Sequence, residues 1–80
     1  MTYAVLTIPE RLITKTNTLR ATARARIAKK LEAACPGNWT IGELRFVQGE
    51  WELFVGVPEH GGGRNWAEGY LADYVYRMAA

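Results

Sequence analysis

The chain has 80 residues, of which 49% are hydrophobic, and it carries a formal net charge of +2. This length and composition indicate one globular domain over residues 1–80 and exclude a disordered chain. A single cysteine excludes an internal disulfide and a cysteine-rich metal site, and no apolar run approaches the roughly 18 residues of a membrane span.

Charge is distributed unevenly along the chain. Residues 1–36 carry seven basic and two acidic side chains, whereas residues 37–80 carry three basic and six acidic ones. The two halves therefore have net charges of +5 and −3. Asymmetry of this kind bears on association with partners and not on the fold.

The chain is predicted to begin with a strand over residues 3–8. This segment consists mostly of strand-favouring residues, and Pro9 after it cannot donate to a ladder. Residues 9–17 fit two alternatives, an extension of this strand or a connecting turn. The sequence does not decide between them.

A helix is predicted over residues 18–35, with Asn17 or Thr18 as its N-cap. The segment is rich in Ala, Arg, Lys and Leu, which favour helices, and Pro36 with Gly37 ends it. The apolar residues recur at helical spacing and form one buried stripe: Leu19, Ala23, Ile27, Leu31 and Ala34.

Residues 40–57 predict a β-hairpin. A glycine in the first position of the two-residue loop Gly49-Glu50 favours a type II′ turn. That loop pairs Phe46 with Leu53, Arg45 with Phe54 and Leu44 with Val55. One face of the hairpin is then core: Leu44, Phe46, Trp51, Leu53, Val55 and Val57. The opposite face holds Glu43, Arg45, Val47, Glu52 and Phe54.

The last predicted element is a helix over residues 65–78, capped by Asn65 after a loop at residues 58–63. Two adjacent apolar stripes run along it: Trp66, Tyr70 and Tyr74, and Leu71, Val75 and Met78. The element order predicts an α+β fold, a small two-layer β-α-β-β-α domain in which two helices lie on one face of an antiparallel sheet.

Catalytic chemistry finds little support in the sequence. The run from His60 to Gly63 matches an oxyanion-hole motif, but that motif acts beside a nucleophilic serine, and the chain contains no serine. The loop over residues 61–64 also fits a backbone anion site or a plain connection. Cys35, expected as a buried apolar residue near a helix end, lies 25 positions from His60. We predict no catalytic residue, no metal site and no cofactor, and therefore no enzyme.

Two surfaces are candidates for binding a partner. The first is the outer face of the hairpin, where an aromatic ring and an arginine accompany carboxylates: Glu43, Arg45, Glu52 and Phe54. The second is the basic helix, with Arg20, Arg24, Arg26, Lys29 and Lys30. These bases flank two sides of the apolar stripe, so we expect weak binding of duplex DNA at physiological salt.

From MTYAVLTIPERL to NWAEGYLADYVYRM, the chain resembles the small phage-borne anti-CRISPR proteins, specifically inhibitors of type I-C CRISPR surveillance complexes. The resemblance covers the whole chain and carries no diagnostic motif. It implies a non-enzymatic protein that binds the surveillance complex (Cascade) and blocks target-DNA recognition or nuclease recruitment. Many proteins of this group are acidic DNA mimics. The positive net charge of this chain would confine such mimicry to its acidic second half.

The resemblance makes a protein complex the expected partner, in the cytoplasm of a bacterial host. The N-terminal segment lacks a basic region and a long apolar run, which also favours the cytoplasm. We expect no membrane interaction, no tight direct binding of nucleic acid, and a monomer or weak homodimer. The alternative function is a small nucleic-acid-binding or regulatory module that uses the basic helix.

Overall fold

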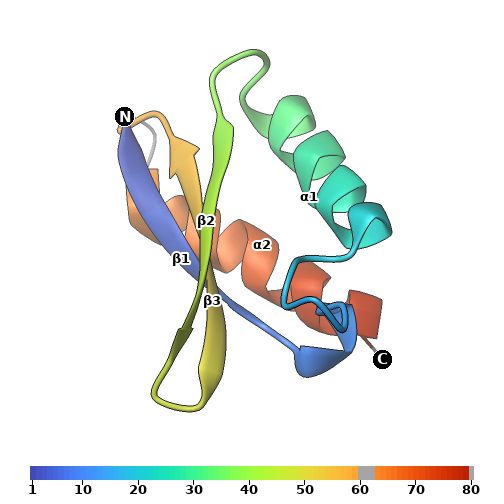
Figure 1. Cartoon of the computed structure of the whole chain (residues 1–80). Coiled ribbons are helices and arrows are strands. Elements are labelled where there is room, and N and C mark those ends of the chain that lie inside the picture. Colours follow the sequence, from blue (N-terminus) through green and yellow to red (C-terminus); the bar gives the residue numbers. More distant parts are fainter. Residues whose placement is uncertain (60–62, 80) are drawn as a thin grey trace.

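A computed structural model gives the structure of the protein and describes residues 1–59 and 63–79 (Figure 1). Its elements follow one another as β1 (Thr2–Ile8), the short 3-10 helix η1 (Glu10–Leu12), α1 (Ala21–Ala34), β2 (Thr40–Val47), β3 (Glu50–Val57) and α2 (Gly63–Ala79). The predicted α+β fold and the order β-α-β-β-α are confirmed. None of the described helices has the length and apolar character needed to cross a membrane.

The three strands form one antiparallel sheet in the order β1-β3-β2, so β3 lies in the middle. Both helices lie on the same side of this sheet, and α2 packs mainly along β1 (Figure 1). We call the side of the sheet toward the helices the inner face. The core lies between this face and the helices: Ala4, Leu6, Ile8, Leu53, Val55 and Val57 from the strands, and Ala23, Ile27, Leu31, Ala67, Leu71 and Val75 from the helices.

The hairpin turn differs from the prediction by one position. Gln48 and Gly49 occupy the loop, both with positive φ (50° and 83°), which is the pattern of a type I′ turn. The predicted pairing of Phe46 with Leu53 is therefore wrong. Leu53 lies opposite Leu44, and Phe46 lies opposite Trp51. Because the register moves by an even number of residues, every side chain stays on its predicted face.

A β-bulge interrupts the pairing of β2 with β3. Ile41 lies opposite Val55 and Leu44 opposite Leu53, so Gly42 and Glu43 share the single partner Phe54. The extra residue turns Ile41 to the same face as Leu44, and both pack against the core. The bulge was not predicted.

Phe46 was predicted as core, but 59% of its surface is exposed. Its ring lies on the inner side of the sheet near the hairpin turn and contacts Trp51 at a centroid distance of 5.0 Å. In Figure 1 the hairpin turn extends beyond the two helices. The sheet thus extends past the helical layer at this end, and the helices leave about half of Phe46 uncovered.

Helix α1 starts later than predicted, at Ala21, and its N-cap Arg20 makes no side-chain capping bond. The predicted caps are wrong because the preceding threonines bond to one another. Thr14 Oγ1 lies 2.7 Å from Thr18 Oγ1 and accepts from the Thr18 backbone N–H. Residues 9–17, left open above, form η1 and a turn closed by an isolated bridge between Ile13 and Leu19. Of the predicted stripe, Ala34 is exposed.

The connection from α1 to β2 is held by one carboxylate. Glu32 Oε1 accepts from the indole N–H of Trp39 at 2.7 Å and from the backbone N–H of Gly37 at 3.1 Å. The Trp39 bond and then the Gly37 bond lower the pKa of Glu32 below its ordinary value of 4.5. Both bonds favour the charged carboxylate.

This contact predicts a pH-dependent loss of stability. Because the pKa of Glu32 is lower in the folded state, its contribution is complete above pH 4.5 and disappears as the pH falls through the lowered value. Glu32→Gln should therefore be less stable than wild type at neutral pH, and the difference in unfolding free energy should shrink in acid. Urea denaturation across a pH series measures this difference. Trp39→Phe, which removes the indole N–H that donates to Glu32, should lose stability at neutral pH in the same way. A difference that stays constant with pH would contradict the assignment.

Candidate partner-binding surface

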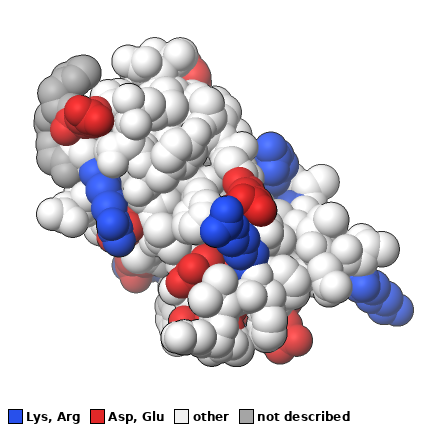
Figure 2. Space-filling model, turned by 60° about the vertical axis from the view of Figure 1, so that its left-hand side comes forward, with Lys and Arg blue, Asp and Glu red and all other residues white. Residues whose placement is uncertain are grey.

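The four residues proposed from the hairpin pattern lie together on the outer face of the sheet, away from the helices. Glu43 and Arg45 belong to β2, and Glu52 and Phe54 belong to β3. We call these four residues the outer-face cluster. Figure 2 turns the left-hand side of Figure 1 forward and shows acidic and basic side chains next to one another amid uncharged surface.

Arg45 is the centre of this cluster. Its Nη2 donates to Glu43 Oε2 at 2.8 Å, and its Cζ lies 5.0 Å from the centroid of the Phe54 ring. Across the strands it lies opposite Glu52, and not opposite Phe54 as predicted. The hydrogen bond and charge of Glu43, with a smaller effect of Glu52, raise the pKa of Arg45.

The cluster therefore presents a guanidinium that contacts two neighbours, Glu43 and Phe54. More than half of the Arg45 and Glu43 side chains remains exposed, at 54% and 60%. A surface group that is already held in place loses less conformational entropy when a partner binds. Arginine and aromatic side chains also supply much of the binding energy at protein interfaces. The arrangement fits recognition of a charged protein surface.

Strand β1 extends this surface, which the sequence interpretation missed. Val5 lies opposite Phe54, Thr7 lies opposite Glu52, and Tyr3, 54% exposed, lies beside Gly56. The alternation of Thr2–Ile8 placed these three side chains on one face of their strand. Only the pairing of β1 with β3 brings that face next to the outer-face cluster, and no local signal reveals this pairing.

The alternative basic surface is not assembled in the same way. Lys30 Nζ lies 4.9 Å from the Tyr74 ring centroid and 5.3 Å from that of Tyr70, so it packs between the two helices. Arg20 Nε donates to the carbonyl of Arg11 at 2.9 Å. The three other bases are exposed at different angles around α1: Arg24, Arg26 and Lys29. The five bases do not form one continuous strip.

The stripe of Trp66, Tyr70 and Tyr74 is half-buried. The first two rings stack at 5.3 Å with an interplanar angle of 11°. Because Lys30 of α1 lies over the rings of Tyr70 and Tyr74, the stripe forms part of the contact between the two helices.

Possible catalytic groups are dispersed. Cys35 is half-buried, its thiol donates to the Leu31 carbonyl at 3.3 Å, and burial, followed by the charge of Glu32, raises its pKa. His60, Gly61 and Gly62 lie outside the described residues, whereas Gly63 and Arg64 are the first residues of α2, so the predicted cap Asn65 lies inside the helix and is wrong. Within the described ranges, no group of three or more metal-ligating side chains occurs.

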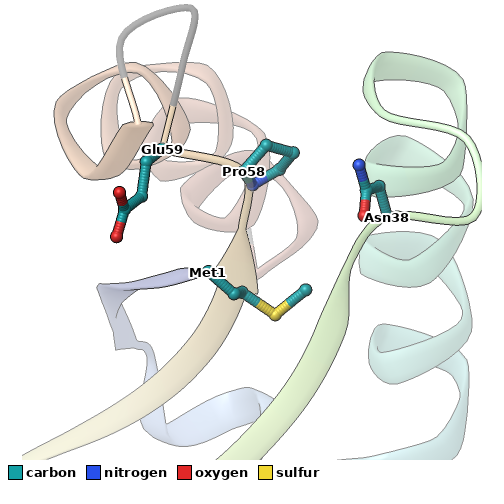
Figure 3. A pocket seen from close by; sticks show the side chains of 4 residues that line it. All are labelled: Met1, Asn38, Pro58 and Glu59. Atoms are coloured by element: carbon teal, nitrogen blue, oxygen red, sulfur yellow. The ribbon is translucent and has the colours of Figure 1, made fainter.

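A hollow of about 270 Å³ lies beside the end of β3 (Figure 3). Its lining comes from four residues: Met1, Asn38, Pro58 and Glu59. The Glu59 carboxylate points away from Asn38 in Figure 3. These side chains offer one carboxylate and one amide that do not converge, so we assign no chemistry to this hollow.

Comparison of the chain with protein-family models, with curated proteins and with solved structures gave no match.

Proposed function

We propose that this protein is a non-enzymatic inhibitor that binds a type I CRISPR surveillance complex, of type I-C, in the bacterial cytoplasm and blocks target-DNA recognition or nuclease recruitment. The class of target comes from the resemblance of the sequence. The observation that carries the mode of action is the outer-face cluster, a pre-positioned arginine between carboxylates and an aromatic ring.

The charges of the cluster suit a partner that grips DNA. Such proteins hold phosphates with lysine and arginine side chains. Glu43 and Glu52 place two carboxylates on one face, and Arg45 pairs closely with the first of them. Glu52 lies across from Arg45 on the central strand, where it is available to a basic side chain of the partner.

The test is binding of purified type I-C surveillance complex by two separate variants, Glu52→Lys and Phe54→Ala. We expect each to raise the dissociation constant by about 30-fold, because a hot-spot residue contributes about 2 kcal/mol. Lys15→Ala, at an exposed position in the turn before α1 that belongs to neither candidate surface, is the control and should bind as wild type. Circular dichroism checks the fold of each variant.

Two outcomes would contradict the proposal. If both folded variants bind the complex with wild-type affinity, the binding surface lies elsewhere. If the free protein binds duplex DNA at physiological salt with a dissociation constant of about 1 μM or less, the nucleic-acid module is the better account.

A further inference from the structure

The outer edge of β1 presents backbone groups that the sheet does not use. β1 is the end strand of the order β1-β3-β2 and pairs on one side only. On the free side, the N–H of Val5 donates to Glu68 Oε2 at 2.8 Å. Alternate residues of an antiparallel strand point their backbone groups to the same side, so those of Tyr3 and Thr7 also point outward.

This edge has few of the features that keep edge strands from pairing. Its sequence, TYAVLTI, contains no charged residue and no proline, and its register with β3 runs without a bulge. Among the described residues, the Glu68 carboxylate is the one group bonded to the outward backbone. The edge therefore has the geometry to accept another strand.

A groove of about 430 Å³ runs beside this edge. Strand β1 and Pro9 form one side of it, with Val5, Leu6 and Thr7. Helix α2 forms the floor with Glu68, Ala72 and Tyr76, and Tyr76 is 72% exposed. An added strand would thus find backbone partners on β1 and a side-chain floor on α2.

The floor residues match the repeat of an extended chain. Helix α2 follows β1 in the same direction, since Glu68 reaches Val5 and the carbonyl of Ala79 accepts from Arg11 at 2.7 Å. Floor residues four apart on a helix are spaced by about 6 Å along its axis. Alternate side chains of a strand repeat at about 6.6 Å, so three successive ones lie over the three floor residues.

The chemistry of the floor sets the chemistry of the occupant. The carboxylate of Glu68 favours a basic side chain at the first position. The small side chain of Ala72 leaves room for a large apolar residue two positions later. If a carbonyl of the partner replaces Glu68 as the acceptor of the Val5 N–H, Glu68 still has its ion pair with Arg64, whose Nε lies 3.1 Å from Glu68 Oε2.

A second copy of this chain does not fit the same edge. A symmetric pairing of two β1 strands would separate them by about 4.8 Å and place both α2 helices beneath the junction. Packed helices need about 8–10 Å between their axes. The occupant is therefore a strand without a helix of its own beneath it.

We propose that the β1 edge binds an extended segment of a partner protein by strand addition. The segment runs in the direction of α2, with a lysine or arginine over Glu68 and a large apolar residue two positions later over Ala72. This surface is separate from the outer-face cluster and does not depend on the proposed target. It is a mode of peptide recognition in which the backbone supplies affinity and the side-chain floor supplies specificity.

The probe is a capped heptapeptide with lysine, leucine and valine at its second, fourth and sixth positions and threonine elsewhere. A second peptide carries glutamate in place of lysine. Titration into ¹⁵N-labelled protein should shift the amide signals of Tyr3, Val5 and Thr7 most, with a dissociation constant below about 1 mM for the lysine peptide. The glutamate peptide should bind roughly three- to tenfold more weakly.

Two variants test the two parts of the site. Thr7→Pro removes an outward N–H at an edge that tolerates proline and should weaken binding about tenfold. Glu68→Lys should reverse the preference, so that the glutamate peptide binds more tightly. If Thr7→Pro does not fold, the charge exchange alone decides.

The proposal is overturned if the lysine peptide gives no saturable shifts at millimolar concentration, or if the shifts lie away from β1 and α2. It is also overturned if Glu68→Lys leaves the preference unchanged. Sedimentation of the free protein gives an independent readout, because a dimer that Thr7→Pro dissociates would identify a second copy as the occupant.

Discussion

Replacing Leu71 with alanine should lower the free energy of unfolding by about 2–5 kcal/mol. The side chain is fully buried in α2, between the helices and the inner face of the sheet, and its removal leaves a cavity. A domain of this length has a total stability of roughly 4–12 kcal/mol. The variant should therefore unfold at a temperature roughly 10 °C lower or more, and urea denaturation gives the free energy directly.

The control for this experiment is Arg77→Ala on the exposed side of the same helix. Arg77 Nη2 lies 2.9 Å from Asp73 Oδ2, and 77% and 67% of the two side chains are exposed. An ion pair of this kind contributes about 0.5 kcal/mol or less. Should Leu71→Ala cost no more than Arg77→Ala, α2 does not pack on the sheet as described.

Gly42→Val should destabilise the fold by about 1–3 kcal/mol. A Cβ at Gly42 would lie 3.1 Å from the backbone carbonyl oxygen of Phe54 and 3.7 Å from a ring carbon of Tyr3. The carbonyl belongs to the central strand, which is paired on both sides and cannot yield easily. Thermal unfolding measures the loss, and displaced backbone signals of Phe54 in NMR spectra would locate it.

Gly69→Ala is the matched glycine control with the opposite sign. An added Cβ there has no heavy atom within 4 Å, and the residue lies inside α2. Alanine in place of glycine in a helix interior should stabilise the protein by about 0.5–1 kcal/mol. If both variants changed stability equally, close approach at the bulge would not be the cause.

The sequence predicted the outer-face cluster because strand alternation assigns faces regardless of the exact turn. A shift of pairing by two residues exchanged the partners of Arg45 and left its face unchanged. The turn itself could not be predicted. Glycine alone fits several turn types, and Gln48 adopts a positive φ that is uncommon for its residue type.

The start of α1 was mispredicted because a threonine serves equally well as a helix cap or as part of a turn. Thr14 and Thr18 bond to each other, and the turn they form takes the place of the predicted cap. The hydrogen bond from Val5 to Glu68 could not be predicted from the sequence, for a different reason. It joins residues 63 positions apart, and only the placement of α2 along β1 brings them together.

The position of β3 in the middle of the sheet has a consequence for synthesis in the cell. β1 leaves the ribosome first, yet its strand partner begins only at Glu50 and its helix partner only at Gly63. Translation adds about 5–20 residues per second, so several seconds pass between the synthesis of Thr2–Ile8 and that of both partners. During that interval a short, uncharged, β-prone segment is exposed to other nascent chains and to chaperones. The fold should therefore assemble in one late cooperative step, after α2 has emerged.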